Sequence, residues 1–321
     1  MIENIELIID NNGEIQQPNV LDGISLQSRR TGSPAILKFD VLKDELANFQ
    51  EGNPVRLVVD GVNMFYGFVF KKRRDKGHII SVTAYDQMRY LKNKDTLNYT
   101  DKTASDVIRM IATKFDLQVG SVEETSYIIP ERNEPDTSLF DIIYDALNLE
   151  LTNTGNLYVF YDDFGELTLK ALGDMKVDLL IDEETGENFD YESSIDDNTY
   201  NRVKLVFANE ETGMNDVYEV QHGENINRWG LLQYYGTLQQ GENGVEKANA
   251  LLDLFNAKTR RLKIINAIGD LSIRAGSMPV IKLNLGDITV QNYMLVESCT
   301  HTFNQSEHFM DLVLRGGEFV G

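Results

Sequence analysis

The residues with the clearest potential for chemistry are one cysteine and two histidines near the end of the chain. Cys299 lies two residues before His301, and His308 follows seven residues later. A thiol beside an imidazole is the pair that cysteine hydrolases use, so Cys299 and His301 suggest a cell-wall peptidase. However, such a nucleophile normally takes its base from elsewhere in the fold, and residues two apart in a strand share a face without aligning for proton transfer. The spacing therefore favours a structural cysteine.

Other polar groups give no stronger indication of catalysis. His301 and His308 could meet across a hairpin, but no carboxylate or third imidazole at recognisable spacing completes a metal site. Asp162 and Asp163 are adjacent in a predicted turn, where side chains diverge into solvent rather than flanking a sugar. The Gly-rich stretch 236–244 lacks the spacing and the lysine of a phosphate-binding loop. We expect no catalytic residue, no metal and no cofactor.

The charge is strongly negative and unevenly distributed. The chain has 321 residues, enough for two or three domains, and a formal net charge of −21. Residues 1–100 hold 13 acidic and 13 basic side chains, residues 101–200 hold 24 and 6, and residues 201–321 hold 14 and 11. This excess of acid disfavours nucleic acid, whose phosphates need Lys and Arg. The nearly neutral end regions are expected if their surfaces are buried against other proteins.

Nothing in the sequence indicates a membrane or a secretory route. No apolar run approaches the roughly 18 residues of a membrane span, and the first residues carry acids where a signal peptide needs bases. We expect synthesis in the cytoplasm and no membrane partner. A single cysteine also excludes an internal disulfide.

A β-pattern near the start of the chain recurs near its end. Each copy orders a Gly, a Pro that opens a strand, a second Gly, an aromatic-led strand and a closing strand. The copies occupy residues 52–61, 65–70 and 78–84, and residues 276–286, 293–297 and 308–314. Short strands between Gly, Asn and Asp turns are typical of closed barrels. We predict a mainly β, α+β fold with two homologous small antiparallel β-barrels.

Between the barrels the periodicity becomes helical. The first barrel is expected over residues 1–95, an α+β insert domain over 96–172, and the second barrel over 173–321. In the insert, Thr103 begins a helix to about residue 115 with a capping box, and a second helix starts near residue 139 with Asp136 or Ser138 as its cap. Residues 157–161 and 167–171 read as a hairpin. The second barrel should contain a strand at 201–207 and an inserted helix near 245–260.

One charged cluster is a candidate interface. Lys71, Lys72, Arg73 and Arg74 lie where the hairpin of the first barrel should turn. A solvated loop tip is the simplest interpretation. Docking onto an acidic neighbour is the functional alternative.

The ordered set of motifs resembles a known family. The stretch 61–115, with Tyr-Gly-Phe-Val at 66–69, Val-Thr-Ala-Tyr-Asp-Gln-Met-Arg-Tyr-Leu at 82–91 and Lys-Thr-Ala-Ser-Asp-Val-Ile at 102–108, is similar to the XkdQ/YqbQ family of tail proteins from PBSX-type prophages. The segments 193–196, 200–203 and 298–303 fit this family in the same order. More distantly, the chain resembles baseplate hub proteins of contractile phages and the late control protein D group.

The resemblance implies a homotrimeric hub in the baseplate of a contractile phage tail or a tail-like bacteriocin. Two barrels per subunit would form a ring of six similar units that joins a hexameric tail tube to a trimeric spike. The implied partners are the tube and spike proteins, a LysM-containing baseplate protein, the tape measure and the wedge proteins. After cytoplasmic synthesis the chain would assemble into the baseplate of a released particle. The alternatives are a hydrolase that uses Cys299 and His301, and a carbohydrate-binding adhesin that uses exposed Tyr side chains and Trp229.

Overall fold

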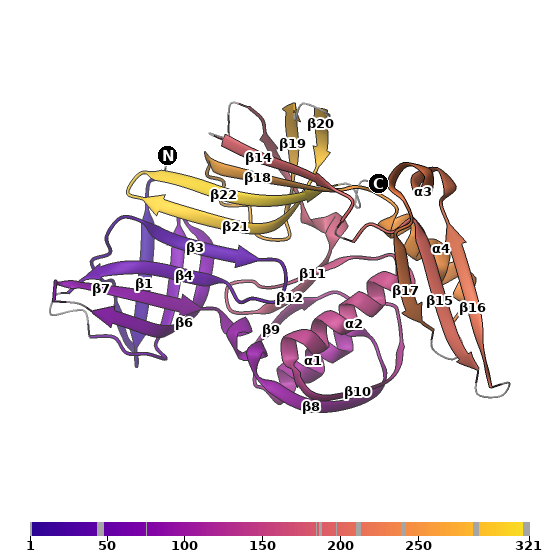
Figure 1. Ribbon diagram of the computed structural model, residues 1–321. Helices are drawn as coiled ribbons and strands as arrows, with labels where there is room; N and C mark the ends of the chain where they lie inside the picture. The colour runs from indigo at the N-terminus through magenta and orange to yellow at the C-terminus, as the bar shows by residue number, and fades with distance from the viewer. Residues whose placement is uncertain are drawn as a thin grey trace.

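The strands dominate the computed structural model of the chain (Figure 1). It describes residues 2–43, 48–74, 76–183, 185, 188–196, 198–209, 213–238, 242–284 and 289–316. A large antiparallel sheet is accompanied by four small sheets and by helices, so the expected mainly β, α+β class is confirmed. Within the described residues, no helix combines the length and the apolar character that crossing a membrane requires.

The N-terminal unit is built from seven strands whose side chains alternate between core and solvent. In β4, for example, Leu37, Phe39 and Val41 point inward and are almost fully buried. Residues of this kind from most of the strands form a single apolar cluster. The strands are β1 (Ile5–Asn11), β2 (Glu14–Gln16), β3 (Ile24–Arg29), β4 (Ile36–Leu42), β5 (Pro54–Val59), β6 (Val62–Arg74) and β7 (Ile79–Tyr85).

The C-terminal unit repeats this strand order. Its strands are β13 (Lys176–Ile181), β14 (Asn188–Ser194), β18 (Thr259–Ile268), β19 (Met278–Asn284), β20 (Thr289–Tyr293), β21 (Leu295–Asn304) and β22 (Glu307–Gly316). The N-terminal strands pair in the order β3-β4-β7-β6-β5-β1. The C-terminal strands pair in two separate runs, β14-β18-β22-β21 and β20-β19-β13, which match this order if β20 and β21 together correspond to the long β6. The pairings match in direction except that β13 runs parallel to β19, whereas β1 is antiparallel to β5.

The two units share one continuous sheet, which the sequence did not reveal. Strand β21 pairs antiparallel with β3, from Ser298 opposite Arg29 to Phe303 opposite Ile24. This ladder joins the units into a sheet of 11 strands, and Figure 1 shows the last hairpin lying along the first unit. Phe303 is fully buried and belongs to the apolar cluster of the N-terminal unit. The end of the chain therefore completes the core of its beginning.

The middle unit contains the two predicted helices. A short 3-10 helix, η1 (Gln87–Lys92), leads from the N-terminal unit into it. The unit comprises β8 (Lys94–Lys102), α1 (Ala104–Lys114), β9 (Val119–Val122), β10 (Ile129–Ser138), α2 (Leu139–Thr154), β11 (Tyr158–Asp162), β12 (Leu167–Ala171) and η2 (Leu172–Met175). The capping box of Thr103 and Asp106 is confirmed, and Ser138 rather than Asp136 caps α2. The predicted hairpin is the β11–β12 pair, and β9 adds a parallel strand to it.

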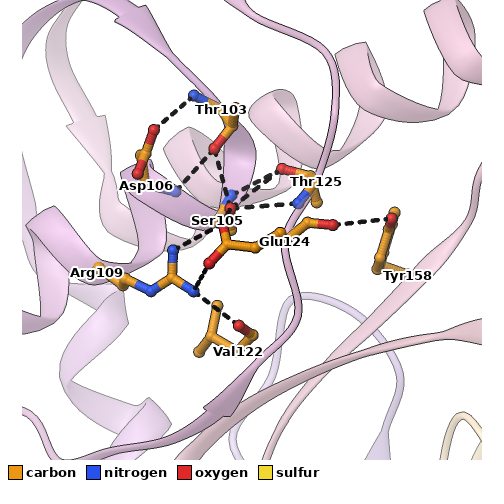
Figure 2. A network of polar contacts seen from close by, with 8 residues as sticks. All are labelled: Thr103, Ser105, Asp106, Arg109, Val122, Glu124, Thr125 and Tyr158. Carbon is orange, nitrogen blue, oxygen red and sulfur yellow. Dashed lines mark hydrogen bonds and ion pairs between the residues drawn. The ribbon is translucent and has the colours of Figure 1, made fainter.

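A polar network fixes the start of α1 against the loop before β10 (Figure 2). Ser105 Oγ donates to Glu124 Oε2 at 3.0 Å, and the Ser105 amide donates to Thr125 Oγ1 at 3.0 Å. Arg109 completes the contact because its guanidinium binds both Glu124 oxygens and the Val122 carbonyl. The network satisfies amides at the helix start that have no partner within the helix.

The insertion in the C-terminal unit is larger than the helix that the sequence indicated. Besides α4 (Gly244–Phe255), it holds β15 (Arg202–Asn209), β16 (Met214–Gln221), α3 (Gly223–Trp229) and β17 (Gln233–Thr237). The strand predicted at 201–207 is β15, but it pairs with β16 and β17 rather than with the C-terminal sheet. Val203, Leu205, Ala248 and Leu251 are buried in a separate apolar cluster. Residues 202–255 therefore form a small unit of their own.

Replacing Phe303 with alanine tests the shared core. We expect Phe303→Ala to lower the free energy of unfolding by about 3–5 kcal/mol, because a large ring at 0% exposure is lost from a packed cluster. Ile268→Ala is the matched control on β18, where the side chain is 63% exposed, and should change stability by less than about 0.5 kcal/mol. Chemical denaturation measures both. Equal effects of the two substitutions would contradict the shared core.

Candidate functional site

The N-terminal, middle and C-terminal units meet at a small buried cluster of polar side chains. Asp86 follows β7, and its carboxylate accepts hydrogen bonds from the Ala35 amide at 2.9 Å and the Met88 amide at 3.0 Å. Gln87 reaches into the middle unit. Its amide nitrogen donates to the carbonyls of Gln118 (3.1 Å) and Gly165 (2.6 Å), and its oxygen accepts from the Gln118 amide. These backbone partners set the position of β12 against the N-terminal unit.

Arg274 extends from the C-terminal unit into the same junction. Its guanidinium donates to the Asp162 carbonyl at 2.6 Å, pairs with the Asp163 carboxylate at 3.3 Å and stacks 3.7 Å from the centre of the Tyr161 ring. Arginine suits this position because its planar group donates in several directions and also packs on aromatic faces. Arg274 therefore holds the β11–β12 turn against the C-terminal unit.

Two buried carboxyl groups, Asp86 and Asp162, lie in this junction, so the expectation that the Asp162 side chain points into solvent is wrong. Burial raises the pKa of Asp162 to about 6, and burial together with the nearby Asp162 charge raises the pKa of Asp86. Two neighbouring carboxylates share a low-dielectric space here, so one of them holds a proton more readily than an exposed acid does. Both carboxylates accept hydrogen bonds from backbone amides, and these bonds hold the backbone of the junction in place.

Tight backbone packing at the junction requires glycine at two turns. Gly165 has φ 95°, and a Cβ there would lie 2.7 Å from the Tyr66 ring. Gly276 has φ 97°, and a Cβ there would lie 2.3 Å from Val159. Both turns sit against a neighbouring unit in conformations that other residues rarely adopt. The close approach leaves no room for a larger side chain at either position.

A second contact between units lies at the end of the β3–β21 ladder. Arg30 donates from Nε and Nη2 to the two carboxylate oxygens of Glu297, at 3.0 and 3.1 Å, and its own amide donates to the Glu297 carbonyl. The hydroxyl of Tyr144, on α2, donates to the Arg30 carbonyl at 3.0 Å. Arg30 therefore contacts the C-terminal and middle units at once. Bidentate pairs of this kind fix geometry more firmly than single ion pairs do.

The candidate basic interface lies away from these junctions. Lys71, Arg73 and Arg74 are exposed, but they lie within β6 and pair with β7, so the expectation that they form the turn of the hairpin is wrong. Lys72 is different: its Nζ donates to the Phe49 carbonyl, lies over the Phe49 ring and is 3.8 Å from Glu51. Lys72 thus has contacts within the N-terminal unit, whereas the other three side chains are exposed.

Cys299, His301 and His308 do lie together, but inside the protein. The Cys299 sulfur is 3.2 Å from His301 Nε2, and this nitrogen is 2.9 Å from the Ile273 carbonyl, to which it must donate its proton. His301 Nδ1 then accepts from His308 Nε2 at 2.8 Å. The nitrogen nearest the thiol already carries a proton, so it cannot act as the base for Cys299.

The environment of these groups also opposes catalysis. Cys299 is fully buried, and burial raises the pKa of its thiol. Burial lowers the pKa of His301 to about 3 and that of His308 to about 4, so both rings are neutral near pH 7. Across the described residues, no group of three or more His, Cys, Asp and Glu side chains is arranged to hold a metal. The cluster therefore acts as packing with satisfied hydrogen bonds.

Sequence reasoning missed the junction residues. Asp86 and Gln87 lie within the stretch that carries the family resemblance, but their types alone do not distinguish them from ordinary turn residues. Arg274 and Glu297 have no motif around them. Only the fold brings these side chains together.

Comparisons with known proteins agree with this architecture. The model of the family described as YQBQ-like matches residues 24–315. The chain belongs to the YQBQ-like family. It is 28% identical over 305 residues to YqbQ and 26% identical over 305 residues to the phage-like element PBSX protein XkdQ, both from Bacillus subtilis (strain 168), with 91% of each chain covered in both comparisons.

Solved structures share the fold at low sequence identity. The 43 kDa tail protein of prophage MuSo2 from Shewanella oneidensis is 10% identical with a TM-score of 0.69, and the match covers 96% of this chain and 98% of that one. The E. coli c3393 protein, a component of the type VI secretion system, is 9% identical with a TM-score of 0.57 over 98% of this chain and 76% of that one. Members of the YQBQ-like family thus share a fold with a tail protein and a secretion component.

The histidine pair gives a pH-dependent prediction. The pKa values of His301 and His308 are lowered by folding, so below about pH 6.5 the unfolded chain binds more protons than the folded one. The contribution of the two histidines to the free energy of unfolding should therefore fall as pH drops from 7 to 5, whereas Asp162, whose pKa is raised to about 6, contributes in the opposite direction. The fall from each histidine is at most about 1.4 kcal/mol per pH unit.

His308→Gln isolates this contribution, since a Gln amide can still donate to His301. Denaturant titrations of both proteins at several pH values should give a shallower pH dependence for the variant. Carboxyl groups titrate alike in both proteins and cancel in the difference. Identical slopes would contradict the neutral state of His308.

Proposed function

We propose that this protein is the structural baseplate hub of a contractile phage tail or a tail-like bacteriocin. In this role three copies form a ring that joins the hexameric tail tube to a trimeric spike. The observation that carries the proposal is the repeated strand order of the N-terminal and C-terminal units. Its support comes also from membership of the family that includes the PBSX protein XkdQ, and from the fold shared with a prophage tail protein.

The hub proposal treats both repeated units as closed barrels. In the N-terminal unit, β2 pairs with β1, and a few residues later Val20 forms an antiparallel bridge with Val41 of β4. Two backbone hydrogen bonds flank this bridge, Leu21 to Asp40 at 2.8 Å and Leu42 to Asn19 at 2.9 Å. The chain thereby leads from β1 back to β4, the pattern expected of a barrel that has no free edge around its core. In the C-terminal unit, one apolar cluster contains side chains from β13, β18, β19, β21 and β22.

Symmetry explains why a repeated unit is useful. A trimer that carries two equivalent barrels per chain presents six similar units in a ring, so one face can match a six-fold tube while the other keeps the three-fold symmetry of a spike. The β3–β21 ladder fixes the two barrels relative to one another. A ring of this kind transmits the force of sheath contraction to the spike and the tube without bending.

The remaining partners follow from the same role. The tube and spike proteins would contact opposite faces of the ring, and a LysM-containing baseplate protein, the tape measure and the wedge proteins would be its neighbours. The exposed Lys71, Arg73 and Arg74 are suited to an acidic neighbour. The acidic middle third would face the channel or the outer rim rather than the tube.

The best candidate for a catalytic site, Cys299 with His301, has no accessible reactive group, and this fits a mechanical role. The thiol of Cys299 is buried and His301 offers it no free nitrogen. Any lytic activity of the particle would then come from another protein.

Assembly and location test the hub directly. Native mass spectrometry of the purified protein, alone and with its spike protein, should detect a trimer. Electron microscopy of induced particles should place the chain at the distal end of the tube as a ring of six similar densities. A protein that is monomeric under both conditions, or that lies elsewhere in the particle, would refute the proposal.

A separate assay tests the non-enzymatic role. Cys299→Ala should leave any peptidoglycan release by purified particles unchanged within twofold, since the thiol does not reach solvent. Loss of release in this variant, with normal particle assembly by microscopy, would instead establish hydrolysis by this chain.

A further inference from the structure

A row of charged side chains crosses the end of the C-terminal sheet. Glu192 on β14 lies opposite Arg261 on β18, and Arg261 lies opposite Arg315 on β22. Glu297 follows on β21 at a break in the β21–β22 register, and it pairs with Arg30. The charges therefore alternate imperfectly, because two arginines are direct neighbours.

The two opposed arginines are unfavourable in the isolated chain. Like charges directly opposite one another on antiparallel strands repel, and the effect is larger where the surface is hollowed and less screened. Glu297 binds Arg30 more closely than it binds Arg315. Both of its oxygens bind Arg30 at about 3 Å, whereas its contact with Arg315 is 3.8 Å long.

These side chains line a cavity of about 410 Å³ that is rich in cations. Four arginines and two glutamates face it, which is a local excess of positive charge in a chain of net charge −21. We call it the arginine pocket, and its charged residues are Arg30, Glu192, Arg260, Arg261, Glu297 and Arg315.

Two of its arginines lack an anionic partner. Among the described residues, neither Arg260 nor Arg261 forms an ion pair, and the Nε of Arg260 is buried without a hydrogen-bond partner. A buried donor without a partner is costly. Within the part of the chain that the structure describes, these two guanidinium groups are therefore available to an added anion.

The shape of the surface favours a protein segment over a small ion. A second cavity, of about 520 Å³, shares Arg30, Thr31, Asn198 and Arg315 with the arginine pocket and continues along α2. Together the two cavities extend from the start of β18 to α2. Bidentate guanidinium groups select carboxylates, and the net charge of the protein works against nucleic acid.

We propose that the arginine pocket binds carboxylate side chains of a second copy of this chain. The inference rests on the trimeric hub proposed above and names one of its contact surfaces. Charge complementarity supports a second copy, because residues 101–200 carry 24 acidic and only 6 basic side chains. An acidic surface of one subunit would then neutralise Arg260 and Arg261 of its neighbour.

Charge reversal at Arg261 tests the contact. Sedimentation velocity of the full-length protein at 50 and 300 mM NaCl should show self-association that weakens with salt and is roughly tenfold weaker in Arg261→Glu. Arg261→Gln should have a smaller effect. Lys282→Glu on β19 is the matched control, since it reverses an exposed charge in the same unit away from the pocket, and it should behave as wild type.

The outcomes separate this inference from the hub itself. Thermal unfolding of each variant monitors folding, and Arg261→Glu should unfold close to wild type because it exchanges one opposed like-charge pair for another. A wild-type trimer that Arg261→Glu leaves unchanged overturns the pocket contact but not the hub. If Arg261→Glu still forms the trimer but is no longer incorporated into tail particles, the pocket binds another tail protein. This outcome also overturns the inference. A wild-type protein that never self-associates overturns both.

Discussion

The ladder between β3 and β21 is the interaction on which the rest of the structure depends. It pairs residues about 270 positions apart, and it places Phe303 of the last hairpin in the core of the first unit. The N-terminal unit cannot complete its packing until nearly the whole chain has been made. Contacts of such long range carry a large loop-closure cost, so the intervening units must fold first or remain independent of the ladder. The separate apolar clusters of the middle unit and of residues 202–255 are consistent with independent folding.

Specific polar contacts between the units add to apolar clusters that cross from one unit to another, such as the cluster of Val159, Tyr161, Met278 and Leu295. Gln87 binds backbone groups of the middle unit, Arg274 reaches it from the C-terminal unit, and Arg30 links to Glu297. Directional contacts of this kind specify one orientation, whereas an apolar face tolerates sliding. The glycines at 165 and 276 contribute in another way, because they allow backbone to approach side chains of the adjacent unit. Such a fixed arrangement would suit the hub proposed above.

Local features of the fold could be predicted from the sequence, and long-range ones could not. The capping box at Thr103, the second helix and the β11–β12 hairpin depend on neighbouring residues, whose spacing is visible in the chain. The repeat was visible too, since Gly and Pro punctuate both copies. Strand partners were not: β15 has the expected alternation but pairs within its own small sheet. Periodicity indicates which residues face a core, but it does not indicate to which of several cores they belong. The junction was equally hidden, because Asp86, Gln87 and Arg274 are polar residues whose roles arise only from proximity.

Cys299 and His301, the candidate catalytic pair, lie on the strand that forms the ladder between the two units. Cys299 lies opposite Ser28 and His301 opposite Leu26, so both residues sit on the strand that joins the two units. Desolvation on this strand keeps the imidazoles neutral and disfavours the thiolate, which is the reactive form. A substrate could reach the sulfur only if β21 separated from its neighbours, and this would open the sheet that holds both repeated units. The residue types that suggest a nucleophile therefore serve the shared core, and the hydrogen bonds among Ile273, His301 and His308 satisfy polar groups that the core would otherwise bury unpaired.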